Sequence, residues 1–144
     1  MNEEKIATLT KLRMVDKYAS FYEIMPEVVH CSVQQKQWVT SLLDECCRQL
    51  IVLFNTHKKP TKTAIKKPIF HCMDELTLAP LDAANREFAY QLGWFIADKS
   101  GVDLRKGSMR KAWGYWAIQA EEVRVVGNPR RKKIMEFTQF VRKE

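Results

Sequence analysis

Apolar residues recur every three or four positions along most of the chain, which is the spacing of one face of an α-helix. The first row follows Asn2, with Glu3 and Glu4 placed where carboxylates favour the positive end of a helix. Its members are Ile6, Leu9, Leu12, Val15, Ala19 and Tyr22. The row predicts a helix that starts at Asn2 and ends before Pro26.

The strongest periodicity starts at Ser32, a residue that can cap a helix, with Gln35 three residues later as the partner in a capping box. Two adjacent apolar rows follow, Trp38, Leu42, Cys46, Leu50 and Phe54 in one and Val39, Leu43, Cys47 and Ile51 in the other. The remaining face carries Lys36, Asp44, Glu45 and Arg48. Because two rows make a wide apolar stripe, we expect this helix to lie at the centre of the domain.

A third helix is predicted after the polar turn at residues 55–60, with Thr61 as its cap. Its apolar positions keep helical phase across Pro68: Ile65, Ile69, Cys72 and Leu76. Proline kinks a helix interior, so the alternatives are one kinked helix over 61–77 or a helix that starts at Pro68. The unbroken phase favours the single helix.

A fourth helix is predicted between Asp82, as its cap, and Ser100-Gly101, because glycine accepts the left-handed conformation that ends a helix. Its buried row is Ala84, Phe88, Leu92 and Phe95, widened by Gln91 and Ile96.

Ser108 can cap a fifth helix, whose apolar and small residues are Met109, Ala112, Trp113, Trp116 and Ala117. We expect Trp113 and Trp116 to pack against Trp94 and Phe88, and Tyr115 to be exposed. Val123–Val126 is interpreted as a frayed helix end or a connector, with a short strand as the alternative.

Asn128-Pro129 is a strong start for a last helix, over about 128–143, with basic residues on one side.

The 144 residues are therefore predicted to form one all-α domain, a bundle of five to six helices with short loops. The basic C-terminal helix is appended to this domain. A composition of 46% hydrophobic residues with five Gly and five Pro excludes a disordered or low-complexity chain.

Several motifs between residues 35 and 118 resemble a family of small bacterial all-helical domains of unknown function. They are the Asn-x-x-Lys-x-Pro turn at 55–60, the Asp-x-x-Asn-Arg-Glu helix start at 82–87, Gly-Val-Asp at 101–103, Gly-Ser-Met at 107–109 and Trp-Gly-Tyr-Trp at 113–116. The resemblance implies a bacterial origin, a helical fold and no established enzymatic activity, and it assigns no functional residue.

No apolar stretch of signal-peptide or membrane-spanning length is present, since the longest strongly apolar run is Leu50–Phe54. Of the four cysteines, Cys46 and Cys47 are adjacent, and none forms a C-x-x-C pair. Reduced thiols in a helical core, in a cytoplasmic protein, are the favoured interpretation.

The pairs His30-Cys31 and His71-Cys72 raise the question of a zinc site. Neighbouring residues on a helix point about 100° apart, so such a pair rarely chelates one metal ion. We expect no metal and no cofactor.

No phosphate loop, nucleophile elbow or zincin motif occurs, and the adjacent acids Asp74-Glu75 are expected to be solvated. The chain is therefore predicted not to be an enzyme.

Positive charge is concentrated in the second part of the chain. Residues 1–50 hold six Lys/Arg and seven Asp/Glu, and residues 51–144 hold eighteen and ten, so the net charge of +7 arises after residue 50. The candidate binding residues are Lys58, Lys59, Lys62, Lys66 and Lys67, then Arg105, Lys106, Arg110 and Lys111, then Tyr115, and finally Arg130, Arg131, Lys132 and Lys133.

These features favour a non-catalytic protein that binds an acidic partner through its basic groups. Small size, a helical domain and missing catalytic motifs are typical of a bacterial immunity or inhibitor protein that neutralises a toxin by direct binding. The alternative is a small regulator that binds nucleic acid through the same cations. We expect no membrane partner.

Overall fold

The computed structural model describes residues 2–21, 28, 30–104, 111 and 113–114. Within these residues the helices are α1 (Glu3–Met14), α2 (Lys17–Ser20), α3 (Val33–Thr56), α4 (Lys62–Leu78) and α5 (Ala83–Lys99). The same residues contain no strand, so the predicted all-α class is confirmed. Of the helix predicted from Ser108 only residues 111 and 113–114 are described, and the segment Val123–Val126 and the helix predicted over 128–143 lie outside the described residues.

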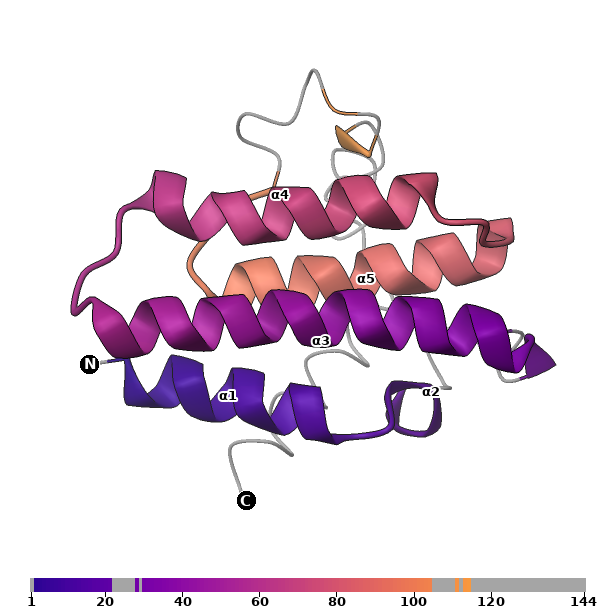
Figure 1. Ribbon diagram of the computed structural model, residues 1–144, viewed down its shortest axis with the longest axis horizontal. Helices are drawn as coiled ribbons and strands as arrows, with labels where there is room; N and C mark the ends of the chain where they lie inside the picture. The colour runs from indigo at the N-terminus through magenta and orange to yellow at the C-terminus, as the bar shows by residue number, and fades with distance from the viewer. Residues whose placement is uncertain (1, 22–27, 29, 105–110, 112, 115–144) are drawn as a thin grey trace, which may run out of the picture.

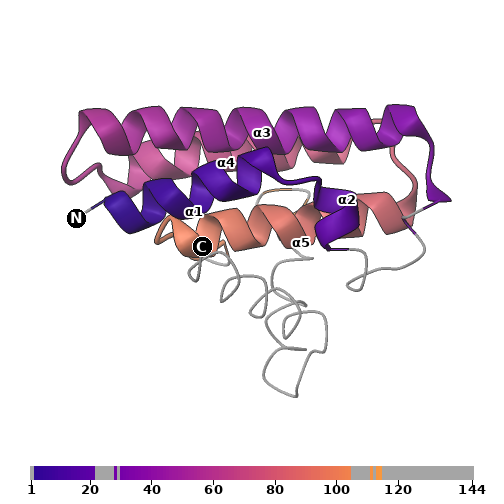
Figure 2. The same cartoon turned by 90° about the horizontal axis from the view of Figure 1, so that it is seen from below.

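The four long helices lie side by side, and each runs antiparallel to the one before it (Figure 1). Seen from the side, α3 and α4 form one face of the bundle and α5 the other, while α1 packs on both α3 and α5 (Figure 2). The N-terminus and the α3–α4 turn share one end of the bundle, and α2 and the α4–α5 turn share the opposite end.

Three predicted caps start the three longest helices. The side chains of Ser32, Thr61 and Asp82 accept hydrogen bonds from backbone N–H groups three residues ahead, at 3.2, 3.1 and 2.8 Å. A capping box also requires the side chain of Gln35 to accept a hydrogen bond from the backbone N–H of Ser32, and this part of the prediction is wrong. Gln35 Oε1 accepts instead from the backbone N–H of Asp82 at 2.9 Å, so this side chain ties α3 to the start of α5.

The single third helix is confirmed, because Pro68 lies inside α4 and the helix continues on both sides of it. The predicted end of α5 is confirmed as well. Gly101 has a φ of +85°, the left-handed conformation that glycine adopts without steric cost.

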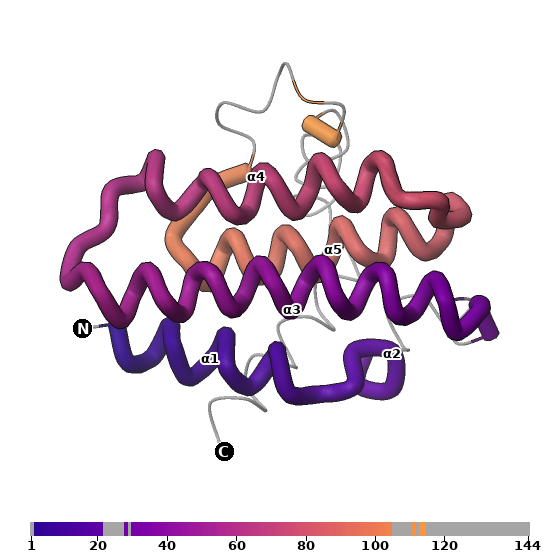
Figure 3. The backbone as a smooth tube through the Cα atoms, viewed as in Figure 1, coloured from indigo at the N-terminus to yellow at the C-terminus, as the bar shows by residue number. Residues whose placement is uncertain are grey.

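The first predicted helix is interrupted (Figure 3). Val15 is extended, with ψ 152°, and the carboxylate of Asp16 accepts from the N–H groups of Tyr18 and Ala19 to start α2. A short acidic side chain competes with the helix for backbone donors in this way. The break turns Lys17 and Tyr18 into the interior and leaves Ala19 exposed, whereas the continuous row placed Ala19 on the buried face.

The most enclosed helix is α5 rather than α3. Every residue from Phe88 to Ala97 is buried, whereas α3 contacts α1, α4 and α5 but keeps an outer face where Val52 is 50% exposed. The approach of α4 to α5 is close at Gly93, where a Cβ atom would lie 2.6 Å from Sδ of Met73. A side chain at this position would therefore force the buried side chain of Met73 to shift.

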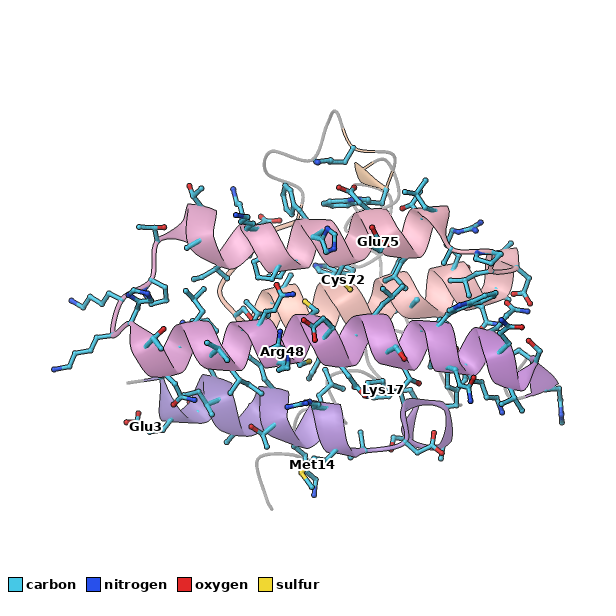
Figure 4. All side chains as sticks on the ribbon, viewed as in Figure 1. Glu3, Met14, Lys17, Arg48, Cys72 and Glu75 are labelled. Carbon is cyan, nitrogen blue, oxygen red and sulfur yellow. The ribbon has the colours of Figure 1, made fainter. Side chains whose placement is uncertain are left out.

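A buried ion pair connects α2 to α3. Lys17 is 1% exposed, and its Nζ lies 2.5 Å from Oδ1 of Asp44, whose side chain is 30% exposed. Figure 4 shows Lys17 beside α3. A buried ammonium group needs such a partner, because removing it from water without compensation costs several kcal/mol.

Removing the carboxylate should therefore destabilise the bundle. We expect Asp44→Ala to lower the free energy of unfolding by about 2–3 kcal/mol in urea denaturation, since it leaves Lys17 buried without a counter-ion. Glu45→Ala is the matched control, because it removes an exposed pair with Arg48 from the same helix and should change stability little. Equal effects of the two substitutions would contradict this role for Asp44.

Candidate functional site

The first predicted basic group lies at one end of the bundle and is called the lysine surface below. It consists of Lys58, Lys59, Lys62, Lys66 and Lys67, from the α3–α4 turn and the first two turns of α4. Four of these lysines are exposed, and Lys66 is half-buried. No Asp or Glu occurs anywhere between Cys46 and Met73, so the segment that carries the lysine surface supplies no counter-charge.

The lysine surface is also not neutralised from elsewhere in the part of the chain that the structure describes. The ion pairs there join other residues, and none of the five lysines has an acidic partner. Lys62 stands in the first turn of α4, which has no acidic residue, although cations at a helix N-terminus oppose the macrodipole. Helix stability therefore does not explain why lysine is placed there.

The backbone beneath the lysine surface is held from the other end of the sequence. The side-chain amide of Asn2 donates to the carbonyl oxygens of Phe54, His57 and Lys58 at 3.0, 3.0 and 3.1 Å. These carbonyl groups belong to the last turn of α3 and to the residues after it, where no backbone N–H of the helix is available to donate to them. Lys5, one turn later in α1, places its ammonium group 5.2 Å from the centre of the Phe54 ring.

The second basic group is only partly described, and Lys111 is its one member with a defined position. Its Nζ lies 3.3 Å from Oδ2 of Asp74 and 5.8 Å from the centre of the Phe70 ring, so this cation is engaged within the fold. Arg105, Lys106, Arg110, Tyr115 and Arg130–Lys133 lie outside the described residues.

Trp113 joins the residues after α5 to α4. Its side chain is fully buried, its ring meets Phe70 edge-on with centroids 4.9 Å apart, and its Nε1–H donates to Oδ1 of Asp74 at 2.8 Å. The burial of Trp113 is thus confirmed, and its ring partner is Phe70, whereas the sequence predicted contacts with Trp94 and Phe88. Asp74 is not merely solvated as predicted, because it accepts from both Trp113 and Lys111.

Three of the four thiols belong to the core. Cys46, Cys47 and Cys72 are buried. Cys72, labelled in Figure 4, connects α4 to α3, since its Sγ lies 3.5 Å from the carbonyl oxygen of Leu42. Burial raises the pKa of Cys47 to about 12, and a hydrogen bond with Cys72 together with burial raises the pKa of Cys46. All four cysteines are free thiols, as predicted.

A cavity of about 300 Å³ lies at the opposite end of the bundle, lined by Val28, His30, Cys31, Asp82, Ala84 and Asn85. Two of its four polar lining residues bind each other, since Asp82 Oδ1 accepts from the backbone N–H of Asn85 at 2.8 Å, and Asn85 is held further by two residues outside the lining. Tyr18 Oη donates to Oδ1 of the fully buried Asn85 at 2.9 Å, and Asn85 Nδ2 donates to Gln35 Oε1 at 3.2 Å. Burial raises the pKa of Tyr18, which keeps the phenol protonated as a donor.

Among the described residues, His30 and Cys31 are the remaining polar side chains of the lining, which are fewer than the four ligands of a structural zinc site. Within the described residues, no three His, Cys, Asp or Glu side chains are placed to hold one metal ion. His71 is an exposed residue of α4 and is not among the residues that line this cavity.

The described part of the chain has no helix that combines the length and the apolar character needed to cross a membrane. The sequence matches no family model, and no curated protein or solved structure is significantly similar to it. The resemblance over residues 35–118 therefore depends on its motifs alone.

The burial of the thiols predicts their reactivity. At pH 8 a group with a pKa near 12 is ionised in about one molecule in ten thousand, and the core also excludes the reagent. We expect iodoacetamide to modify the half-buried Cys31 in the native protein and to modify the other three cysteines only after unfolding, as measured by peptide mass spectrometry. Equal rates at all four would show that the core opens readily.

Proposed function

We propose that this chain is a non-catalytic binding protein whose lysine surface contacts an acidic surface of another protein. The observation that carries the proposal is a group of five lysines, gathered at one end of the bundle, that have no acidic partner among the described residues. Unneutralised charge of one sign raises the rate at which an oppositely charged protein associates, and it fixes the orientation of the encounter.

The specific form we propose is a bacterial immunity or inhibitor protein that covers the active site of a toxin. A helical body with closely packed helices presents a preformed surface, so binding costs little conformational entropy. The tightly packed contact at Gly93 and the buried pair of Lys17 and Asp44 support such rigidity. A rigid surface with one sign of charge suits a stoichiometric inhibitor.

Binding to nucleic acid is the second candidate, since the same lysines would neutralise phosphates. One feature favours protein. The bonds of Asn2 hold the start of α1 beside the α3–α4 turn, which brings the exposed Glu3 and Glu4 to the same end of the bundle. A polyphosphate backbone is anionic on every side and meets these carboxylates as well, whereas a protein can place acidic side chains on the lysines and other side chains beside Glu3 and Glu4.

Charge reversal tests the proposal. The variant is Lys58→Glu, Lys59→Glu, Lys62→Glu and Lys67→Glu together, and the matched control is Arg13→Glu with Arg48→Glu, exposed cations of α1 and α3. Calorimetry with the purified product of the adjacent gene should show a 1:1 complex. We expect reversal at the lysine surface to weaken it about 100-fold and the control to change affinity less than about threefold.

Two results would contradict the proposal. One is the absence of a complex, combined with binding of duplex DNA whose affinity falls steeply with salt concentration. The other is a complex that both variants weaken equally, since the contact would then lie elsewhere on the molecule.

A further inference from the structure

Asn2 connects two parts of the chain that the sequence separates by more than fifty residues. Its one amide group donates to three carbonyl oxygens, and two of them belong to His57 and Lys58, which begin the turn that carries Lys58 and Lys59. From the other side, Thr61 caps α4 by accepting from the backbone N–H of Ala64 at 3.1 Å. The backbone on both sides of the turn is thus fixed by side-chain hydrogen bonds.

The lysines beyond the turn have a regular spacing. Lys62 and Lys66 are four residues apart on α4, which places them on one side of the helix and about 6 Å apart along its axis. Two glutamates four residues apart on another helix have the same spacing. An acidic helix laid along the start of α4 therefore places one carboxylate near each of these lysines and continues toward the turn.

We infer that the lysine surface accepts an acidic helix whose carboxylates recur every four residues, and that Asn2 is a positioning residue for it. This inference rests on the proposed function and names the kind of partner segment. By holding the turn, Asn2 fixes Lys58 and Lys59 relative to Lys62 and Lys66. A fixed array of charges distinguishes one pattern of carboxylates from another, whereas a loose turn binds any acidic segment equally.

Charge complementarity selects this occupant over others. The five lysines face no acid in the described part of the chain, and Glu3 and Glu4 lie at the same end through the bonds of Asn2. A helix with glutamates on one face and neutral or basic residues on the other meets the lysines with the first face and tolerates the nearby acids. A uniformly anionic polymer does not have this second face.

The test uses two alanine-rich helical peptides of about 20 residues and identical composition. In one, glutamates recur every four residues on a single face, and in the other they are spread around the helix. Fluorescence anisotropy with the full chain should show about fivefold tighter binding of the one-faced peptide. Asn2→Ala should bring the ratio of the two affinities close to one, because the one-faced peptide should lose more affinity than the other.

A matched control separates positioning from general destabilisation. Asp16→Ala removes a different cap, at the opposite end of the bundle, and should leave the preference at its parent value. If Asn2→Ala keeps the fivefold preference, or if the parent binds both peptides equally, the inference is overturned.

The fourfold lysine-to-glutamate variant separates this failure from failure of the proposed function. One outcome is that this variant no longer binds either peptide, while the parent binds both with equal affinity. The acidic-partner proposal then stands, and only the pattern of carboxylates on the helix is wrong. If the variant binds both peptides as tightly as the parent does, or if the parent binds duplex DNA more tightly than both peptides, the proposed function fails as well.

Discussion

Enclosure of α5 is the constraint on which the remaining structure depends. Ten consecutive residues of this helix, from Phe88 to Ala97, are buried, so every side of it must be covered by other parts of the chain. α4 approaches so closely that a Cβ atom at Gly93 would lie 2.6 Å from Sδ of Met73, whose side chain would have to move. The apolar faces of α1, α3 and α4 are turned inward to cover α5 and one another, and this also places three of the four thiols in the core.

Inward packing of the apolar rows determines where the charge lies. Between Cys46 and Met73 the core takes Leu50, Phe54, Ile65 and Ile69, and the polar positions that remain on the outside are rich in lysine and contain no acid. The α3–α4 turn gathers these lysines at one end of the bundle. Asn2 and Thr61 hold that end through backbone hydrogen bonds without supplying any negative charge. The fold thus places five lysines at this end and pairs none of them with an acid among the described residues.

The sequence predicted features that depend on local chemistry. The caps at Ser32, Thr61 and Asp82, the helix through Pro68 and the end at Gly101 follow from residue type and spacing, and so does the clustering of the lysines. The break at Val15 was missed, because periodicity alone does not distinguish an aspartate on a helix surface from one that caps a new helix.

Longer-range features could not be read from periodicity. The enclosure of α5 was missed because Asn85 and Tyr90 look like surface residues until the partners packed around them are known, although the burial of Gln91 was predicted. The signal that was present is the run from Ala89 to Ala97, which contains no charged residue. The contact of Asn2 with the α3–α4 turn, and that of Trp113 with Asp74, join positions far apart in the chain. Such pairs are defined only by the tertiary fold.

Covalent labelling of lysines in the free and partner-bound protein tests the central claim most directly. Acetylation read by mass spectrometry, with the adjacent gene product as the partner, should show Lys58, Lys59, Lys62 and Lys67 protected in the complex. Lys36 of α3 and Lys99 of α5 should react equally in both states. The account would be contradicted if the partner protected Lys36 and Lys99 while the four lysines of the lysine surface were labelled as strongly as in the free protein.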